Sequence, residues 1–196
     1  MEIIIHRVNK LSLLKKIPFN FGLEVDLRTY KSEIILNHEP FKNGLKFSDF
    51  LENYNHQTLI LNIKESGIED LVLEQIRKFK IKKYFFLDLE FPYIYKCKVK
   101  HFKNIAIRYS ELEPIENAKI LKNNFKWIWI DTFTKLPVNK KNINFFKNYK
   151  TCIVCPERWG RENDIIKYIN ILKKISFKPS AVMTSLNCSQ IWNKFS

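Results

Sequence analysis

Eight short apolar segments recur at fairly even spacing along this chain of 196 residues, and they restrict its fold more than any other feature. Each is a few residues long and rich in Ile, Val, Leu and aromatic residues, which is typical of strands buried on both faces of a parallel sheet. The segments are 3–5, 23–27, 59–63, 84–89, 105–108, 127–130, 152–155 and 181–183.

Most of these segments are separated by a stretch with apolar residues at helical spacing. The clearest are 68–79 and 164–175, which each place five apolar residues on one face. Ser66 precedes the first as a candidate cap, with Glu69 three residues later. Shorter candidate helices are 47–51, 113–121, 143–149 and 188–195. Strands that alternate with helices indicate parallel pairing.

Parallel pairing leaves a choice between a doubly wound sheet and a closed barrel. Eight strands favour the barrel, although about 250 residues is typical of that fold and roughly 200 is near its lower limit. We therefore predict an α/β fold: a compact (β/α)8 TIM barrel with shortened or missing helices. The short first gap and Pro92 predict little or no helix after the first and fourth strands. No linker rich in Gly or Ser divides the chain, so we expect one domain over residues 1–196.

The charge balance, 34 basic against 20 acidic residues, raises the question of a nucleic-acid partner. Only six of the basic residues are arginine, the residue that recognises phosphates and bases through two hydrogen bonds at once. The lysines are scattered along the sequence without a block of like charge. We expect a weak attraction for anionic small molecules and no nucleic-acid partner.

No apolar run approaches the roughly 18 residues that a membrane span needs, and the first residues do not resemble an export signal. We therefore expect no membrane span and a cytoplasmic location. In that compartment the four cysteines should be reduced and mostly buried. Cys152 and Cys155 have the spacing of a zinc-binding pair, but the chain lacks a second pair, so zinc is not expected.

Charged or hydrogen-bonding residues stand at the C-terminal end of one apolar segment after another. In a parallel barrel this end of the strands supplies the chemistry. Packing alone does not explain such a ring, because buried charges are costly unless they are paired or bound to a metal. Asp88, Glu90, Arg108 and Asp131 belong to this set and could shape a pocket, but the sequence leaves their orientation open.

The first strands carry the most specific combination of these residues. Glu24 and Asp26 alternate with Val25 and so share a face, where two carboxylates repel unless a cation lies between them. Oxygen ligands of this kind suit Mg2+ or Ca2+. His6 and His38 are expected at the same barrel mouth, where one imidazole could act as acid and the other as base.

Positive charge accompanies these groups. Arg7 follows His6 directly, and Lys64 lies at the end of the third predicted strand, where the two could contact a phosphate.

In this order and spacing the residues resemble the glycerophosphodiester phosphodiesterase family, within the superfamily that includes phosphatidylinositol-specific phospholipase C. The family pattern is His-Arg on the first strand, Glu-x-Asp on the second, His-Asp about a dozen residues later, and Glu-x-Lys on the third. His6 and Arg7, Glu24 and Asp26, His38, and Lys64 match it. The specific part covers roughly residues 3–64, and the loop after His38 lacks the family's usual inserted subdomain.

The resemblance implies a role for each matched residue. Glu24 and Asp26 would hold a divalent metal, with Asn62 at the position of the third ligand. His6 and His38 would be the general acid and base. Arg7 and Lys64 would stabilise the charge on the phosphate. The small-molecule product would be glycerol 3-phosphate together with an alcohol.

The chain departs from the family at three points. Val8 replaces a glycine, the usual Glu-Asn of the first helix has no equivalent, and Asn62 replaces a glutamate. An asparagine can still coordinate Mg2+ or Ca2+ through its carbonyl oxygen but adds no charge. Two functions therefore stay open: a metal-dependent phosphodiester hydrolase acting on a glycerophosphodiester or sugar-phosphate diester, or a non-catalytic barrel that binds a phosphorylated ligand.

Overall fold

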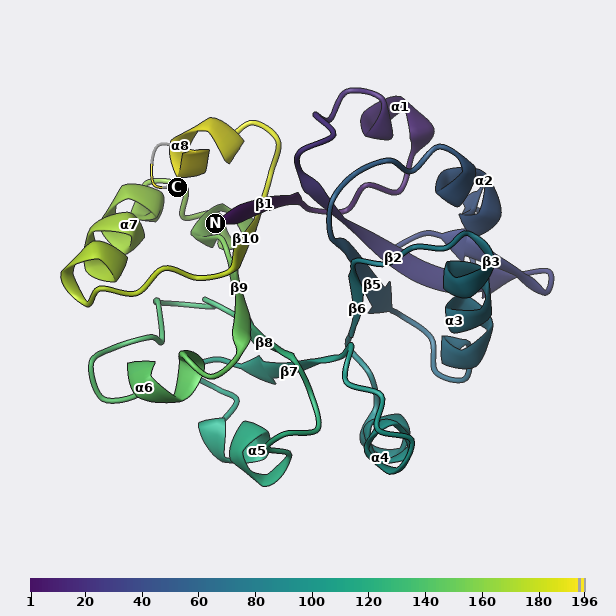
Figure 1. Ribbon diagram of the computed structural model, residues 1–196. Coiled ribbons are helices and arrows are strands. Elements are labelled where there is room, and N and C mark those ends of the chain that lie inside the picture. Colours follow the sequence, from purple (N-terminus) through teal and green to yellow (C-terminus); the bar gives the residue numbers. More distant parts are fainter. Residues whose placement is uncertain (194, 196) are drawn as a thin grey trace.

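The computed structural model describes residues 1–193 and 195. Eight parallel strands surround a central axis, and the helices lie outside them (Figure 1). These strands are β1 (Glu2–Ile5), β2 (Gly22–Tyr30), β5 (Leu59–Ile63), β6 (Tyr84–Leu87), β7 (Ala106–Tyr109), β8 (Trp127–Ile130), β9 (Lys150–Val154) and β10 (Ala181–Thr184). All eight segments that the sequence predicts as strands are strands.

The sheet closes into a barrel. The order of hydrogen-bonded strands is β7-β8-β9-β10-β1-β2-β5-β6. Its two ends meet at a parallel bridge between Phe86 and Ile105, beside which the Phe86 N–H donates to the Asn104 carbonyl oxygen at 2.9 Å. The predicted (β/α)8 barrel is thus confirmed, and the doubly wound alternative is excluded.

Short helices explain how a barrel fits into so short a chain. They are α1 (Leu11–Leu14), α2 (Phe47–Glu52), α3 (Glu69–Lys78), α4 (Phe91–Val99), α5 (Ile115–Ile120), α6 (Ile143–Phe146), α7 (Asp164–Lys174) and α8 (Ser189–Asn193), with a 3-10 turn, η1 (Pro156–Trp159). The predicted helix 188–195 includes Lys194, which lies outside the described residues. Within the described part of the chain, no helix has the length and apolar character that crossing a bilayer requires.

Two local predictions are wrong. The helix after the fourth strand is not missing: α4 is nine residues long, because Pro92 lies in its first turn, where a proline removes no helical hydrogen bond. Ser66 does not cap α3, whose first flanking residue is Ile68. Instead the Glu69 carboxylate accepts a hydrogen bond from the Gly67 N–H at 2.8 Å. The reduced helix predicted after the first strand is found as α1.

The barrel interior is filled by side chains and is not a channel. The Phe85 and Trp127 rings stack with their centroids 4.4 Å apart, and Ile4, Ile60 and Met183 lie in the same buried cluster. A second apolar layer fills the space between the strands and the helices. The four cysteines are free and buried, as predicted. Polar side chains are thereby confined to the ends of the barrel.

An antiparallel extension of β2 reaches beyond the barrel mouth. The second half of β2 pairs with β3 (Glu33–Leu36), and β3 pairs with the two residues of β4 (Leu45–Lys46). His38 lies two residues after the end of β3, so this extension carries it back to the C-terminal end of the barrel.

Candidate active site

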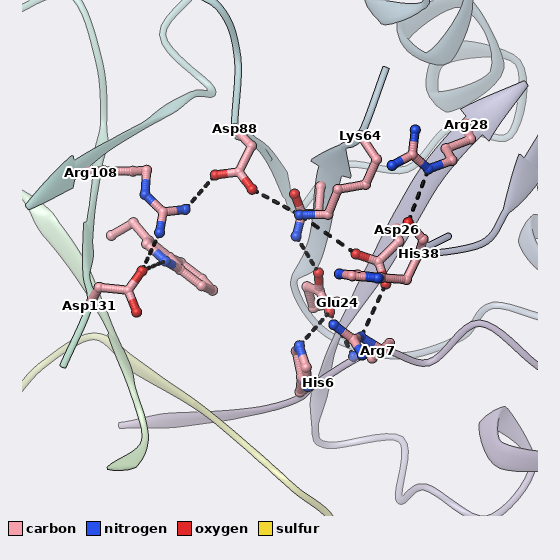
Figure 2. Close-up of polar contacts among 12 residues, drawn as sticks. His6, Arg7, Glu24, Asp26, Arg28, His38, Lys64, Asp88, Arg108 and Asp131 are labelled. Carbon is pink, nitrogen blue, oxygen red and sulfur yellow. Dashed lines mark hydrogen bonds and ion pairs between the residues drawn. The ribbon is translucent and has the colours of Figure 1, made fainter. Parts of the chain in front are cut away.

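Two buried carboxylates form the centre of the site. Glu24 and Asp26 alternate with Val25 on β2, and their exposed fractions are 0% and 1%. The Arg7 N–H donates to Glu24 Oε2 at 2.6 Å, and the Asn62 amide donates to Glu24 Oε1 at 2.7 Å (Figure 2). Parallel pairing of β2 with β5 sets Asp26 beside Asn62. The three predicted metal ligands therefore lie together.

Asp26 is held by three neighbours. Asn9 donates its amide to Asp26 Oδ2 at 2.8 Å and accepts the Asp26 N–H at 3.0 Å. Arg7 Nε lies 3.5 Å from Oδ2, and Lys64 Nζ lies 3.8 Å from Oδ1. Sequence reasoning missed Asn9, since a single asparagine in a loop carries no signal of its partner.

The two predicted histidines reach the same cavity from different segments. His6 directly follows β1 and places Nε2 3.8 Å from Glu24 Oε2. His38 has its carbonyl oxygen bound by Arg28 Nε at 3.0 Å and its Nδ1 2.7 Å from the Glu39 carboxylate. Both line a cavity of about 160 Å³ at the mouth of the barrel, together with Arg7, Glu24, Asp26, Asn62 and Lys64.

Burial and charge shift the titration of two of these groups. Burial, reinforced by the negative charge of Asp26, raises the pKa of Glu24 to about 7. Burial also lowers the pKa of His6 to about 3, and the positive charges of Arg158 and Arg7 act in the same direction. The His6 imidazole is therefore neutral at pH 7.

The backbone is strained at two points on the rim. Arg7 and Asp88 have φ values of 57° and 60°, in the left-handed region that residues other than glycine seldom occupy. The conformation of Arg7 accompanies the short hydrogen bond from its N–H to Glu24. Strain of this kind is found preferentially at functional sites.

A chain of ion pairs covers the opposite side of the cavity. Lys64 Nζ lies 2.9 Å from Asp88 Oδ2, and Arg108 bonds the other oxygen of Asp88 at 2.5 Å. Arg108 also pairs with Asp131, which accepts a further hydrogen bond from the Trp129 indole at 3.1 Å. The sequence left the orientation of Asp88, Arg108 and Asp131 open; Figure 2 shows Arg108 pointing toward the two carboxylates, and all three residues line the cavity.

Two aromatic residues border the cavity. Trp159 lies on its rim, where it contacts Phe133 with ring centroids 4.8 Å apart and the Arg158 guanidinium lies over its ring. Trp129 is buried beneath and still forms part of the cavity wall. Glu157, by contrast, points toward β10, where it accepts hydrogen bonds from Thr184 and from the Ser185 N–H.

The donor set suits a hard divalent cation. Among the described residues no group of three or more His, Cys, Asp or Glu could hold a metal, and here the two carboxylates are accompanied by the amide of Asn62. Asp26 Oδ1 and Asn62 Oδ1 are both buried and have no hydrogen-bond partner among the described residues. Two carboxylates and one amide oxygen fit Mg2+ or Ca2+ and do not fit zinc.

Comparison with known proteins gives matches among solved structures alone. No protein-family model and no curated protein matches this chain. A phosphodiesterase from Oleispira antarctica, solved with its product sn-glycerol-3-phosphate, has 12% sequence identity and a TM-score of 0.71 over 100% of this chain and 97% of that one.

Two further structures agree. A putative glycerophosphoryl diester phosphodiesterase from Agrobacterium tumefaciens has 9% identity and a TM-score of 0.68, covering 99% of this chain and 97% of that one. A glycerophosphoryl diester phosphodiesterase from Parabacteroides distasonis has 9% identity and a TM-score of 0.66, covering 98% and 86%. The resemblance found in the sequence is thus confirmed at the level of the fold: the chain has the barrel of the glycerophosphodiester phosphodiesterases over its whole length.

Proposed function

We propose that this protein is a metal-dependent phosphodiester hydrolase acting on a glycerophosphodiester or a sugar-phosphate diester. The observation that carries the proposal is the convergence of seven side chains from separate segments on one cavity. These are His6, Arg7, Glu24, Asp26, His38, Asn62 and Lys64. The product in the Oleispira antarctica structure, sn-glycerol-3-phosphate, supports a substrate of this class.

In this proposal the acidic side of the cavity holds the metal. Glu24, Asp26 and Asn62 would bind Mg2+ or Ca2+, which when bound draws charge from the phosphate oxygens. Arg7 and Lys64 flank Asp26 from two sides and would contact the remaining phosphate oxygens. Val8, which replaces the family's glycine, is fully buried with its side chain in the apolar layer, and its backbone N–H donates to the Glu24 carbonyl oxygen at 2.8 Å.

The two imidazoles would move the protons. A water or substrate hydroxyl oxygen forms a bond to phosphorus while the bond from phosphorus to the alcohol oxygen breaks. One histidine accepts the proton of the nucleophile, and the other donates a proton to the departing alcohol. The Glu39 carboxylate at Nδ1 fixes the ring orientation of His38.

A panel of phosphodiesters, assayed with and without Mg2+ and Ca2+, tests this function. Removal of a general acid or base should lower turnover by about 100-fold or more, so His6→Ala and His38→Ala should each abolish most of it. His101→Asn is the matched control, because His101 is exposed and outside the cavity, and asparagine accepts its positive φ. A folded protein without metal-stimulated turnover of any diester would contradict the proposal.

A second candidate function is the binding of a phosphorylated ligand without turnover. Asn62 already donates to Glu24, and Arg7 and Lys64 already pair with Asp26, so the acidic pair is partly neutralised by the protein itself. If the protein only binds such a ligand, glycerol 3-phosphate or inorganic phosphate should raise its melting temperature in the presence of a chelator. Metal-dependent turnover of a diester would exclude this second function.

A further inference from the structure

The lysines that look scattered in the sequence gather on one face of the barrel. Six segments run from the C-terminal end of a helix into the next strand, and these connections contain sixteen lysines and no Asp, Glu or Arg. Every one of these lysines is exposed. Their combined charge exceeds the net charge of the whole chain, which is +14. These connections are 15–21, 78–83, 98–104, 121–126, 147–150 and 173–180.

Parallel strand order explains the gathering. All connections that enter a parallel strand emerge on its N-terminal side, so they form a ring at the end of the barrel opposite the candidate active site. Backbone hydrogen bonds link neighbours in this ring: the Lys126 N–H donates to Lys103 at 2.9 Å, and the Lys150 N–H donates to Lys126 at 3.0 Å. Figure 1 shows the strands and helices arranged around the barrel axis.

The positive charge of this face is not compensated locally. None of the sixteen lysines forms an ion pair with any described residue. Glu2, which accepts hydrogen bonds from the Thr58 N–H and hydroxyl at 2.8 Å, and Glu52, the last residue of α2, adjoin the face, but their two negative charges offset only a small part of sixteen positive ones. Asp88 and Asp131 lie at the opposite end. The molecule is therefore strongly polarised along the barrel axis.

Apolar side chains are exposed among these lysines. Phe19 in connection 15–21 is 65% exposed, and Val99 in connection 98–104 is 61% exposed. Exposed apolar residues within a lysine-rich surface are typical of proteins that lie on a lipid bilayer.

We propose that this N-terminal face docks the protein onto an anionic lipid bilayer. A flat membrane surface can contact all six connections of the ring at once. A nucleic acid is a linear polyanion and would contact only those connections that lie along one line. The six connections contain lysine and no arginine, which suits attraction to a diffuse layer of charge rather than recognition of single phosphates or bases. In this orientation the mouth that holds His6 and His38 points away from the bilayer and stays open to water.

Sedimentation with phosphatidylcholine vesicles, with and without phosphatidylserine, tests the proposal on the full-length protein and requires no turnover. Binding should depend on phosphatidylserine and weaken as salt is raised, because salt screens the attraction. Equal binding to both vesicle types, or no binding to the anionic vesicles at low salt, would overturn the proposal. The result is independent of whether the protein hydrolyses a diester.

A charge-matched pair of triple variants locates the surface. Replacing Lys103, Lys126 and Lys150 by glutamine should weaken binding to anionic vesicles by on the order of a hundredfold, since each lysine near such a surface contributes roughly a fivefold factor. The control replaces Lys135, Lys140 and Lys141, which are exposed in the connection after β8, and removes the same charge. Equal losses in the two variants would contradict docking through the N-terminal face.

Binding to a DNA duplex and to single-stranded RNA under the same salt conditions separates the two kinds of polyanion. We expect vesicle binding to persist at salt concentrations that abolish nucleic-acid binding. The proposal would be overturned if the protein bound no vesicles but bound a nucleic acid tightly, and if the Lys103, Lys126 and Lys150 variant lost that binding. The partner of this face would then be a nucleic acid.

Discussion

At the scale of single residues, Asn62 is the position that should decide how strongly the proposed metal site holds a cation. It places an amide beside Glu24 and Asp26, where the glycerophosphodiester phosphodiesterase pattern has a carboxylate. Asn62→Glu adds a third negative charge, so we expect at least about tenfold tighter binding of Mg2+ or Ca2+. Calorimetric titration measures this affinity. Asn62→Gln adds length without charge and should bind the metal no better than the natural protein; equal gains in both variants would contradict the assignment.

The contact between Asn9 and Asp26 could not be predicted from a single sequence. His6, Arg7, Glu24, Asp26, His38 and Lys64 could be predicted because their residue types and order form a pattern. Nothing in the sequence links Asn9 to a partner, and only the closure of β1 against β2 brings it to Asp26. The orientation of Arg108 toward Asp88 and Asp131 was hidden for the same reason.

Loss of the Asn9 side chain should destabilise the fold measurably. Asn9→Ala removes both hydrogen bonds to Asp26 and leaves a buried carboxylate with fewer partners, which should lower the free energy of unfolding by about 1–3 kcal/mol. Urea denaturation measures this change. Asn20→Ala is the control, because Asn20 is exposed and its side chain forms no hydrogen bond with any described residue. A loss no greater than that of the control would show that Asn9 does not hold Asp26.

At the scale of elements, the β3–β4 extension places His38, and Gly44 limits how it can pack. A Cβ at Gly44 would collide with the Leu36 carbonyl oxygen and lie 3.0 Å from its carbon, so Gly44→Ala must displace the extension. We expect a loss of about 1–3 kcal/mol in stability and a lower rate of metal-stimulated hydrolysis. Gly67→Ala is the control, since a Cβ there meets no atom within 4 Å and adds only the strain of a positive φ. Equal effects of the two variants would contradict this role.

Prediction of strands and helices succeeded where an apolar pattern repeats and failed where one residue is compatible with two different local structures. Strands buried on both faces give short apolar runs, so all eight were recognisable. Pro92 is compatible with either a break or the first turn of a helix, and only the structure of α4 distinguishes the two. The antiparallel extension of β2 was missed because 33–36 continues the apolar pattern without a marked turn, although Lys31 and Ser32 both adopt positive φ there.

At the scale of the whole molecule, the arrangement of charge could not be predicted by reading the lysines in sequence order. They are spaced evenly because each connection into a strand contributes a few, and only barrel closure unites them on one face. The closed sheet also buries Cys152 in β9 and Cys155 just after it, which bears on how the barrel opens. Cys152 and Cys155 are fully buried, and burial raises the pKa of both thiols. Burial also raises the pKa of Cys97 to about 11.

Thiol labelling should therefore report the opening of the whole barrel. A raised pKa lowers the fraction of reactive thiolate, and burial excludes the reagent, so at pH 8 the native protein should react with a disulfide reagent far more slowly than the unfolded chain. All four thiols should react at once in denaturant. Across urea concentrations the labelling rate should follow the unfolding equilibrium measured by circular dichroism. Rapid native-state labelling of Cys152 or Cys155 would show instead that β9 separates from its neighbours without global unfolding, and that the ring of strands is not the cooperative unit.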